Sequence, residues 1–419
     1  MSFFTSKFAD RIGGSGFGIE TEVFKFEQIK RAKRAACTAH PEIPLIDLGV
    51  GESDQAAFTP VVERLRREAG LLENRGYADN GIPEFTRSAV RYLENEFSVT
   101  GIDSTREILH CIGSKSAFAQ IPLAFINPGD VALVTVPGYP ILSSYTRYLG
   151  GEVYPLPLYA SNGFLPDLDS IPAAIARRAK LLYINYPNNP TGALANRAFF
   201  EKVVEWAHEH EVIIVHDAAY GALVYDGNKP LSLLSIPGAK DVGIEVHSLS
   251  KSFNMTGWRL GFIAGNAEAV AAVAVIKDNS DSGQFRAIQK AGVEALDSYQ
   301  LTQKNRERYS RRFDILIPAL RDAGFLVTKS GGTFYVYAPS PTGTADGIRF
   351  SNAQDFSTFL IHNKLISTVP WNEAGEYIRL SVTFGILPGG RPGESEEEGE
   401  RRTVDEIRSR LLSARLVFD

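Results

Sequence analysis

A lysine, two serines and an arginine lie close together in residues 247–262, HSLSKSFNMTGWRLGF. Ser248 and Ser250 precede Lys251, and Arg259 follows the lysine eight positions later. Two hydroxyl groups and a guanidinium fork suit a phosphate dianion. A lysine beside such a site can form a Schiff base with an aldehyde when its amine is partly deprotonated. A lone lysine here would be an ordinary solvated residue, but this set predicts a site for a phosphorylated aldehyde.

Pyridoxal 5'-phosphate is the cofactor that is both an aldehyde and a phosphate, and its ring nitrogen needs an anionic partner. Asp217 ends the apolar run VIIVHD, where a buried carboxylate is costly unless it is paired. Tyr220 follows three residues later and is expected to reach the ring hydroxyl. Taken alone, Asp217 fits a helix cap at a strand end equally well.

Two further stretches fit the same cofactor. In LHCIGSKSAFAQ, Ser114 and Lys115 stand where a strand gives way to a helix, and a helix N-terminus favours phosphate. An ordinary strand-to-helix turn is the alternative. In NYPNNPTGAL, Asn189 precedes a proline in a turn, from which its side chain can donate to the phenolate oxygen of the cofactor.

A tyrosine and an arginine complete the set. Tyr139 lies just past a strand between two prolines, where its ring can stack on a flat cofactor, although exposed turn tyrosines are equally common. Arg379 lies inside the apolar run EYIRLSVTF, and a buried arginine needs a partner. That partner is either the α-carboxylate of a substrate or an internal salt bridge.

The elements that carry these residues alternate along the chain. Apolar runs predict strands at 107–112, 131–136, 180–186, 212–217 and 243–249, and one of the helical patterns between them covers 196–211. This alternation predicts an α/β fold with a mostly parallel sheet covered on both faces. Such sheets bind ligands at the carboxyl ends of their strands, where the strand-end residues above fall.

The rest of the chain predicts a smaller α+β domain. We expect helices at 24–40, 305–325 and 354–364, and strands within 333–339 and 376–384. The boundaries that follow are a large cofactor-binding domain over 50–300, and a small domain from 1–49 and 301–419 with an N-terminal helical arm. Residues 387–402 are Gly/Pro-rich and acidic, which favours an exposed loop.

Composition narrows the class of protein. The 419 residues are 44% hydrophobic and 22% charged with a net charge of −5, so no general affinity for nucleic acid is implied. Cys37 and Cys111 cannot form a disulfide framework, and their neighbours favour buried, reduced thiols. The N-terminus does not resemble a signal peptide and no apolar run is long enough to cross a membrane, which predicts a cytoplasmic location. Nothing in the sequence indicates a metal.

In the order S-L-S-K-x7-R-x-G, Asp-x-x-Tyr and Asn-Pro-Thr-Gly, the motifs resemble those of the class I/II, fold type I pyridoxal phosphate-dependent aminotransferases. The resemblance runs from IDLGVGESD to Arg379 and implies a seven-stranded sheet. It implies that Lys251 carries the cofactor and moves the proton, with Asp217 and Tyr220 as the other catalytic residues. The implied cofactor ligands are Ser114, Lys115, Tyr139, Asn189, Asp217, Tyr220, Ser248, Ser250, Lys251, Arg259 and, from a neighbouring subunit of a homodimer, Tyr77. The implied substrate contacts are Gly51, Phe24, Lys115, Tyr139, Asn189 and Arg379.

Other stretches are similar to the branch of this family that acts on LL-diaminopimelate, among them GSKSA, HDAAYGAL and FKFEQIKRAKRAA. That branch exchanges the amino group with 2-oxoglutarate, forms tetrahydrodipicolinate or LL-diaminopimelate, and serves lysine biosynthesis. Phe24 and Asp79-Asn80 depart from the pattern of that branch. The resemblance implies that these positions help to bind the distal ammonium and carboxylate of the substrate. The alternatives are an aminotransferase for aspartate, alanine or another small amino acid, a pyridoxal phosphate lyase, and a binding protein with a degenerate site.

Overall fold

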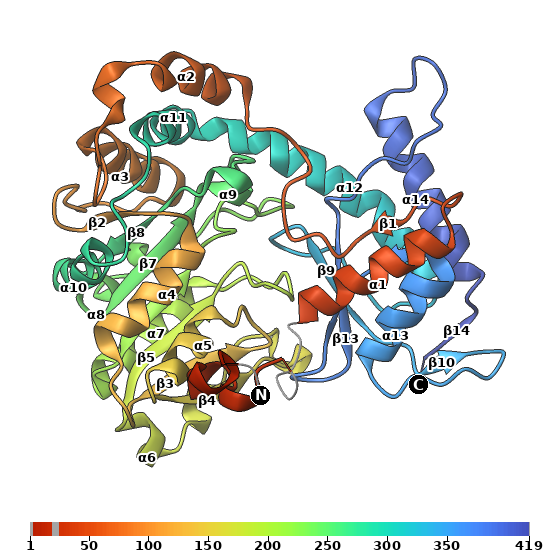
Figure 1. The fold of residues 1–419 in the computed structure, drawn as a ribbon, viewed down its shortest axis with the longest axis horizontal. Helices are drawn as coiled ribbons and strands as arrows, with labels where there is room; N and C mark the ends of the chain where they lie inside the picture. Colours follow the sequence, from red (N-terminus) through yellow and green to blue (C-terminus); the bar gives the residue numbers. More distant parts are fainter. Residues whose placement is uncertain (1–2, 19–24, 419) are drawn as a thin grey trace.

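The computed structural model describes residues 3–18 and 25–418. A seven-stranded sheet in the order β2-β8-β7-β6-β5-β3-β4 forms the centre of the large domain (Figure 1). Strand β8 runs antiparallel to both of its neighbours, and the other pairs are parallel. The mostly parallel sheet predicted from the sequence is therefore confirmed. Its strands are β2 Ile108–Cys111, β3 Val131–Val136, β4 Glu152–Pro157, β5 Ala179–Asn185, β6 Ile213–Asp217, β7 Gly243–Ser248 and β8 Gly261–Gly265.

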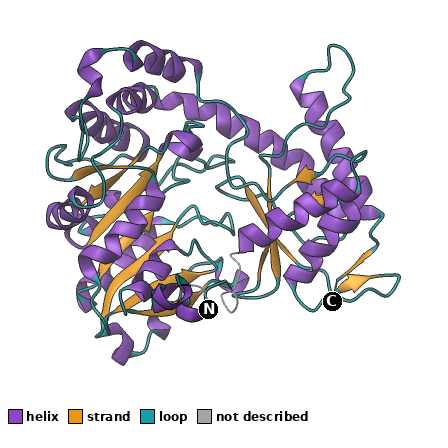
Figure 2. Cartoon of the chain, in the orientation of Figure 1, coloured by secondary structure: helices purple, strands orange, loops and turns teal. Residues whose placement is uncertain are grey.

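Helices cover both faces of this sheet, because successive residues of its buried strands point to opposite sides (Figure 2). On one face, Leu133 and Ile214 pack with Val203 of the helix α7. On the other face, Val134 and Val215 pack into a separate cluster. The helices of the large domain are α2 Thr59–Ala69, α3 Pro83–Phe97, α4 Ser114–Phe125, α5 Ile141–Tyr148, α6 Ala173–Ala176, α7 Arg197–His210, α8 Ala239–Val242, α9 Leu249–Ser252, α10 Ala267–Asp278 and α11 Arg286–Asp297.

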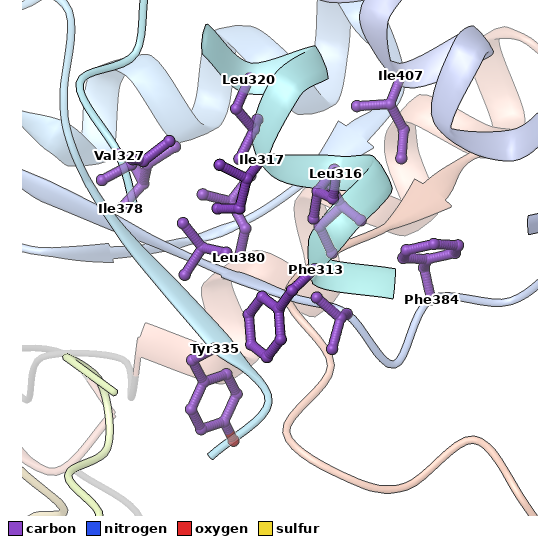
Figure 3. Packing of buried hydrophobic residues seen from close by; sticks show 14 of the residues in the cluster. Phe313, Leu316, Ile317, Leu320, Val327, Tyr335, Ile378, Leu380, Phe384 and Ile407 are labelled. Atoms are coloured by element: carbon purple, nitrogen blue, oxygen red, sulfur yellow. The ribbon is translucent and has the colours of Figure 1, made fainter. Parts of the chain in front are cut away.

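The small domain is built on an antiparallel sheet in the order β12-β13-β9. The long helix α12, Thr302–Asp322, runs from the large domain into it (Figure 1). Leu316 and Leu320 of this helix share a buried core with Ile378 and Leu380 of β13, Tyr377–Ser381 (Figure 3). The remaining elements are α1 Lys25–Ala39, β1 Ile46–Asp47, β9 Tyr335–Pro339, β10 Gly343–Thr344, α13 Ala353–Phe359, β11 Ile366–Ser367, β12 Val369–Trp371, β13 Tyr377–Ser381, α14 Glu396–Leu412 and β14 Leu416–Val417.

The N-terminal helix α1 packs on the small domain, where Ile29 and Ala36 contact Val369 and Trp371. The sequence predicted this placement of the N-terminal helical arm with the small domain. The domain boundaries at 50 and 300 stay a prediction. Among the described residues, no helix is both long and apolar enough to span a membrane.

Two expectations from the sequence are wrong. Residues 387–402 are not one exposed loop, because α14 begins at Glu396 behind a capping box formed by Ser395 and Glu398. Glu400 of this helix is fully buried and forms ion pairs with Arg311 and Arg312 of α12. The acidic composition of the segment gave no sign of this burial. Cys37 is exposed, whereas Cys111 is buried as expected.

Candidate active site

A cavity of about 450 Å³ lies between the strand ends of the large sheet and the sheet of the small domain. Pockets of this size bind small molecules and cofactors. Most of the residues that the sequence singled out line it, although they come from distant parts of the chain. They are Gly51, Ser114, Lys115, Tyr139, Asn189, Asp217, Tyr220, Ser248, Ser250, Lys251, Arg259 and Arg379.

Asp217 is the last residue of β6 and is 5% exposed. One carboxylate oxygen accepts a hydrogen bond from the Tyr183 hydroxyl at 2.9 Å, and the other accepts from the Ala219 amide at 3.0 Å. Burial raises the pKa of Asp217, and these donors oppose that shift. No ion pair reaches Asp217 from the described residues. A buried carboxylate in this position is suited to pair with a cationic ligand group.

Lys251 lies on α9, the helical turn that Ser248 caps by accepting a hydrogen bond from the Ser250 amide. Its Nζ donates to the Gly51 carbonyl at 2.6 Å. Burial lowers the pKa of Lys251 to about 8. The amine is therefore partly neutral close to physiological pH, the form that acts as a nucleophile or a base.

Arg259 and the beginning of α4 form a cradle for an anion. The guanidinium of Arg259 donates to the Thr256 carbonyl at 2.7 Å and to the Ser250 hydroxyl at 3.4 Å. It also lies against Gly113, where a Cβ would approach Arg259 Nη2 to 2.3 Å. Because a helix N-terminus carries partial positive charge, a cation placed beside it is unfavourable until an anion binds.

Arg379 reaches the cavity from β13 and is 2% exposed. Its guanidinium donates to the Asn189 side-chain oxygen at 2.9 Å and to the Gly49 carbonyl at 3.2 Å, and lies 4.0 Å from the Tyr335 ring centre. Its Nε is buried and has no hydrogen-bond partner within residues 3–18 and 25–418. The internal salt bridge considered from the sequence is absent among the described residues, so the guanidinium can bind a carboxylate ligand.

Tyr77, one of the predicted site residues, does not line this cavity. Tyr77 is 79% exposed, and its carbonyl accepts hydrogen bonds from Arg286. Phe24 lies outside the described residues. Of the two departures noted near Tyr77, Asn80 donates from its side chain to Asp278 at 2.8 Å.

The cavity also contains residues that sequence reasoning missed. Tyr335 of β9 lines it, and its hydroxyl lies 2.9 Å from that of Tyr220. Tyr183 bonds Asp217 from the neighbouring strand, and the tyrosine in KLLYINY was the available signal. Trp371 and the carboxylates Glu52 and Glu373 also line the cavity. No local motif marked these three.

Comparison with known proteins agrees with the geometry. Residues 43–385 match the family model described as aminotransferase class I and II. The chain is 52% identical to the LL-diaminopimelate aminotransferase of Methanocaldococcus jannaschii and 49% identical to that of Methanococcus maripaludis, with full coverage of each pair. It is also similar to the structure of substrate-bound BacF from Bacillus subtilis, with a TM-score of 0.86, 30% identity and 98% coverage of both chains.

Proposed function

The chain belongs to the class I and II aminotransferases, and we propose that it transfers an amino group between LL-diaminopimelate and 2-oxoglutarate in lysine biosynthesis. The observation that carries the proposal is the lining of the cavity. Lys251 and Arg379 suit the amino-acid end of a substrate, and Lys115, Glu52 and Glu373 add charges of both signs. A diaminopimelate substrate has a second ammonium and a second carboxylate for such groups to bind.

Enzymes of this family use pyridoxal phosphate, and the cavity fits it. Asp217 is a buried carboxylate without an ion-pair partner among the described residues, which suits the ring nitrogen. Because Gly113 has no side chain, the Arg259 guanidinium can lie beside the N-terminus of α4. This pairing of a cation with a helix N-terminus suits the phosphate. When bound, this cofactor supplies an electron sink for the bond that breaks at the substrate Cα. We assign the ligand roles to Ser114, Lys115, Tyr139, Asn189, Asp217, Tyr220, Ser248, Ser250, Lys251 and Arg259.

The chain itself binds the substrate and moves one proton. Arg379 binds the α-carboxylate and orients the Cα–H bond of the substrate. Lys251 Nζ then takes the Cα proton, because burial lowers its pKa to about 8 and leaves a neutral amine. Asn189 already uses its side-chain oxygen to hold Arg379, so its NH2 group is the part that can donate to the cofactor.

We further propose a homodimer in which Tyr77 serves the cavity of the partner subunit. Tyr77 is 79% exposed, and Leu71 and Leu72 of the same segment are 45% and 76% exposed, so three large side chains of one segment face solvent in the single chain. A subunit interface over this surface would cover all three. The cytoplasmic location stays a prediction.

The test is a set of half-reactions. The purified enzyme loaded with cofactor is mixed separately with LL-diaminopimelate, glutamate, aspartate and alanine, and conversion of the cofactor to its amine form is followed by absorbance. We expect fast conversion with diaminopimelate and glutamate and slow conversion with aspartate and alanine. If diaminopimelate gives no response while aspartate or alanine does, the enzyme acts on small amino acids and the proposed substrate is wrong.

A further inference from the structure

Three ionisable side chains form a buried cluster behind the candidate active site. His216 precedes Asp217 on β6, and Glu245 and His247 lie on the neighbouring strand β7, where Glu245 is paired with His216. His216 and Glu245 are fully buried and His247 is 3% exposed. Because side chains alternate along a strand, these three lie on the face of the sheet opposite Asp217 and Ser248. The cluster and the cavity thus share the same two strands.

Glu245 accepts four hydrogen bonds, two at each carboxylate oxygen. One carboxylate oxygen accepts from His247 Nε2 at 2.6 Å and from the Ser232 hydroxyl at 2.7 Å. The other accepts from His216 Nδ1 at 2.7 Å and from the Leu233 amide at 2.8 Å. A backbone amide, a hydroxyl group and two ring nitrogens surround its two oxygens, and a carboxylate that accepts at every contact is ionised. Burial by itself raises the pKa of Glu245, but hydrogen bonds from the two histidines are among the influences that lower it.

His216 meets an acceptor at each ring nitrogen. Nδ1 faces Glu245, and Nε2 lies 3.0 Å from the Tyr186 carbonyl. A carbonyl and an ionised carboxylate have no proton to donate, so both ring nitrogens must carry one. Only the imidazolium form of His216 satisfies both contacts. His247 needs a proton only at Nε2, so the cluster is neutral overall when His247 is neutral.

We infer that Glu245 holds His216 as a buried imidazolium, and that this ion pair positions Asp217 and keeps it ionised for the ring nitrogen of the cofactor. Glu245 bonds His216, and Asp217 is the next residue in the chain. By holding His216, Glu245 therefore also holds the end of β6 that carries Asp217. The positive charge of His216 is one of the influences that oppose the rise in the Asp217 pKa on burial. His216 and Glu245 are positioning residues, because neither lines the cavity.

The other groups around the cluster leave this protonation unchanged. Tyr92 of α3 has its ring centre 6.2 Å from that of His247, and burial raises the pKa of Tyr92 far above neutral. Phe200 of α7 packs edge-on against His216, and Phe262 of β8 stacks on His247. Ser232 is uncharged. From these elements, the charge nearest to His216 is thus the carboxylate that binds it.

His110 supplies an internal reference for the test. It is also fully buried, but its Nδ1 has no hydrogen-bond partner in the part of the chain that the structure describes. Burial lowers the pKa of His110 to about 4, so it is neutral near pH 7. Nitrogen-15 spectra of the histidine rings, recorded on the full-length enzyme loaded with cofactor, distinguish the two forms. We expect His216 doubly protonated and His110 neutral, with the His216 signals assigned by their loss in His216→Gln. A neutral His216 in the unmutated enzyme would overturn the inference, whatever the variants do.

The effect on Asp217 is measured as cofactor affinity. We expect Glu245→Gln to raise the pyridoxal phosphate dissociation constant about tenfold, the effect of one pKa unit at Asp217. The double variant that combines Glu245→Gln with His216→Gln should lose no more cofactor affinity than the single variant with the larger loss, because the two residues act as one pair. Glu400→Gln is the matched control, since Glu400 is equally buried, pairs with Arg311 and Arg312, and does not line the cavity. A folded Glu245→Gln protein with unchanged affinity would contradict the positioning role.

The inference rests on the cofactor use that we assign to this cavity, and not on the proposed substrate. Both measurements are made without an amino acid. A negative result here therefore leaves the diaminopimelate assignment standing. An enzyme that does not accept diaminopimelate would in turn leave this inference standing.

Discussion

The two arginines of the cavity are held by different parts of the molecule. Arg259 lies at the strand ends of the large sheet, and its guanidinium bonds Thr256 and Ser250, three and nine residues away. Arg379 comes from the small domain and bonds Asn189 and Gly49, which are 190 and 330 residues away. The side that we assign to the phosphate is therefore local in sequence, whereas the side that we assign to the substrate is assembled across two domains.

Because of this difference, we expect substitutions on the two sides of the cavity to affect different measured quantities. The phosphate side depends on a few neighbouring residues, so a local substitution should alter cofactor affinity. The substrate side depends on how the small domain packs against the large one. Arg379 lies on β13 of the small domain, and it donates a hydrogen bond to Asn189 of the large domain. Changes in the packing of the small domain should therefore alter KM before they alter cofactor affinity.

Lys251 belongs to both sides, and its loss should have the largest effect. We expect Lys251→Ala to lower kcat by about a thousandfold, because Lys251 is the amine that we assign to take the Cα proton. The measurement is steady-state turnover with diaminopimelate and 2-oxoglutarate. Lys240→Ala is the control, since Lys240 lies on α8, bonds Glu107 and does not line the cavity. Near-normal turnover in Lys251→Ala would remove this residue from the chemistry.

Arg379→Ala should have the next largest effect, on the substrate side only. It removes the expected carboxylate anchor and leaves the Asn189 oxygen unpaired. We expect kcat/KM to fall by about a hundredfold to a thousandfold, about 3–4 kcal/mol, with cofactor affinity nearly unchanged. Kinetics and cofactor titration on the same preparation measure both. An equal loss of cofactor affinity would show that the two sides are not separate.

Gly113→Ala should have a moderate effect, on the cofactor side. Gly113 has a φ of +72°, and an added Cβ would lie 2.3 Å from Arg259 Nη2. We expect the cofactor dissociation constant to rise about tenfold because the guanidinium must move. Gly101→Ala is the matched control, with a φ of +74° and no atom of the described residues within 4 Å of the new Cβ. Both variants share the backbone strain, so equal cofactor affinities would refute the cradle.

The smallest expected effect is a shift, toward lower pH, of the midpoint at which the Lys251 amine becomes reactive. Burial lowers its pKa from 10.5 to about 8, so its neutral amine appears as pH rises through about 8. In enzyme free of cofactor, an amine-selective reagent should label Lys251 with a midpoint near that pH, as measured by mass spectrometry of peptides. A midpoint near the ordinary lysine value, about 10.4, would contradict the buried environment.

The residues that we assign to the cofactor were easier to predict as neighbours in one cavity than those that we assign to the substrate. Ser248, Ser250, Lys251 and Arg259 fall within one short stretch, and Asp217 ends an apolar strand. Periodicity and spacing therefore indicated that these residues lie together, and all five line the cavity. Parallel strands then bring such ends to one edge of the sheet.

Long-range contacts were the part that could not be predicted. Tyr335 and Trp371 reach the cavity through the packing of the small domain, and no spacing rule connects them with Asp217. The contact between Glu245 and His216 depends on strand register, which the sequence does not give. The helix that begins at Glu396 was missed because its glutamates read as a solvated run, although Glu400 is neutralised by arginines of α12.

The most direct test of the account follows the amino group itself. LL-diaminopimelate labelled with nitrogen-15 is incubated with 2-oxoglutarate and the enzyme loaded with cofactor, and the products are separated by mass spectrometry. We predict that the label appears in glutamate while the diaminopimelate is converted to its cyclic dehydrated keto product. Label that stays in diaminopimelate, or that is released as ammonia without forming glutamate, would contradict the proposed amino transfer.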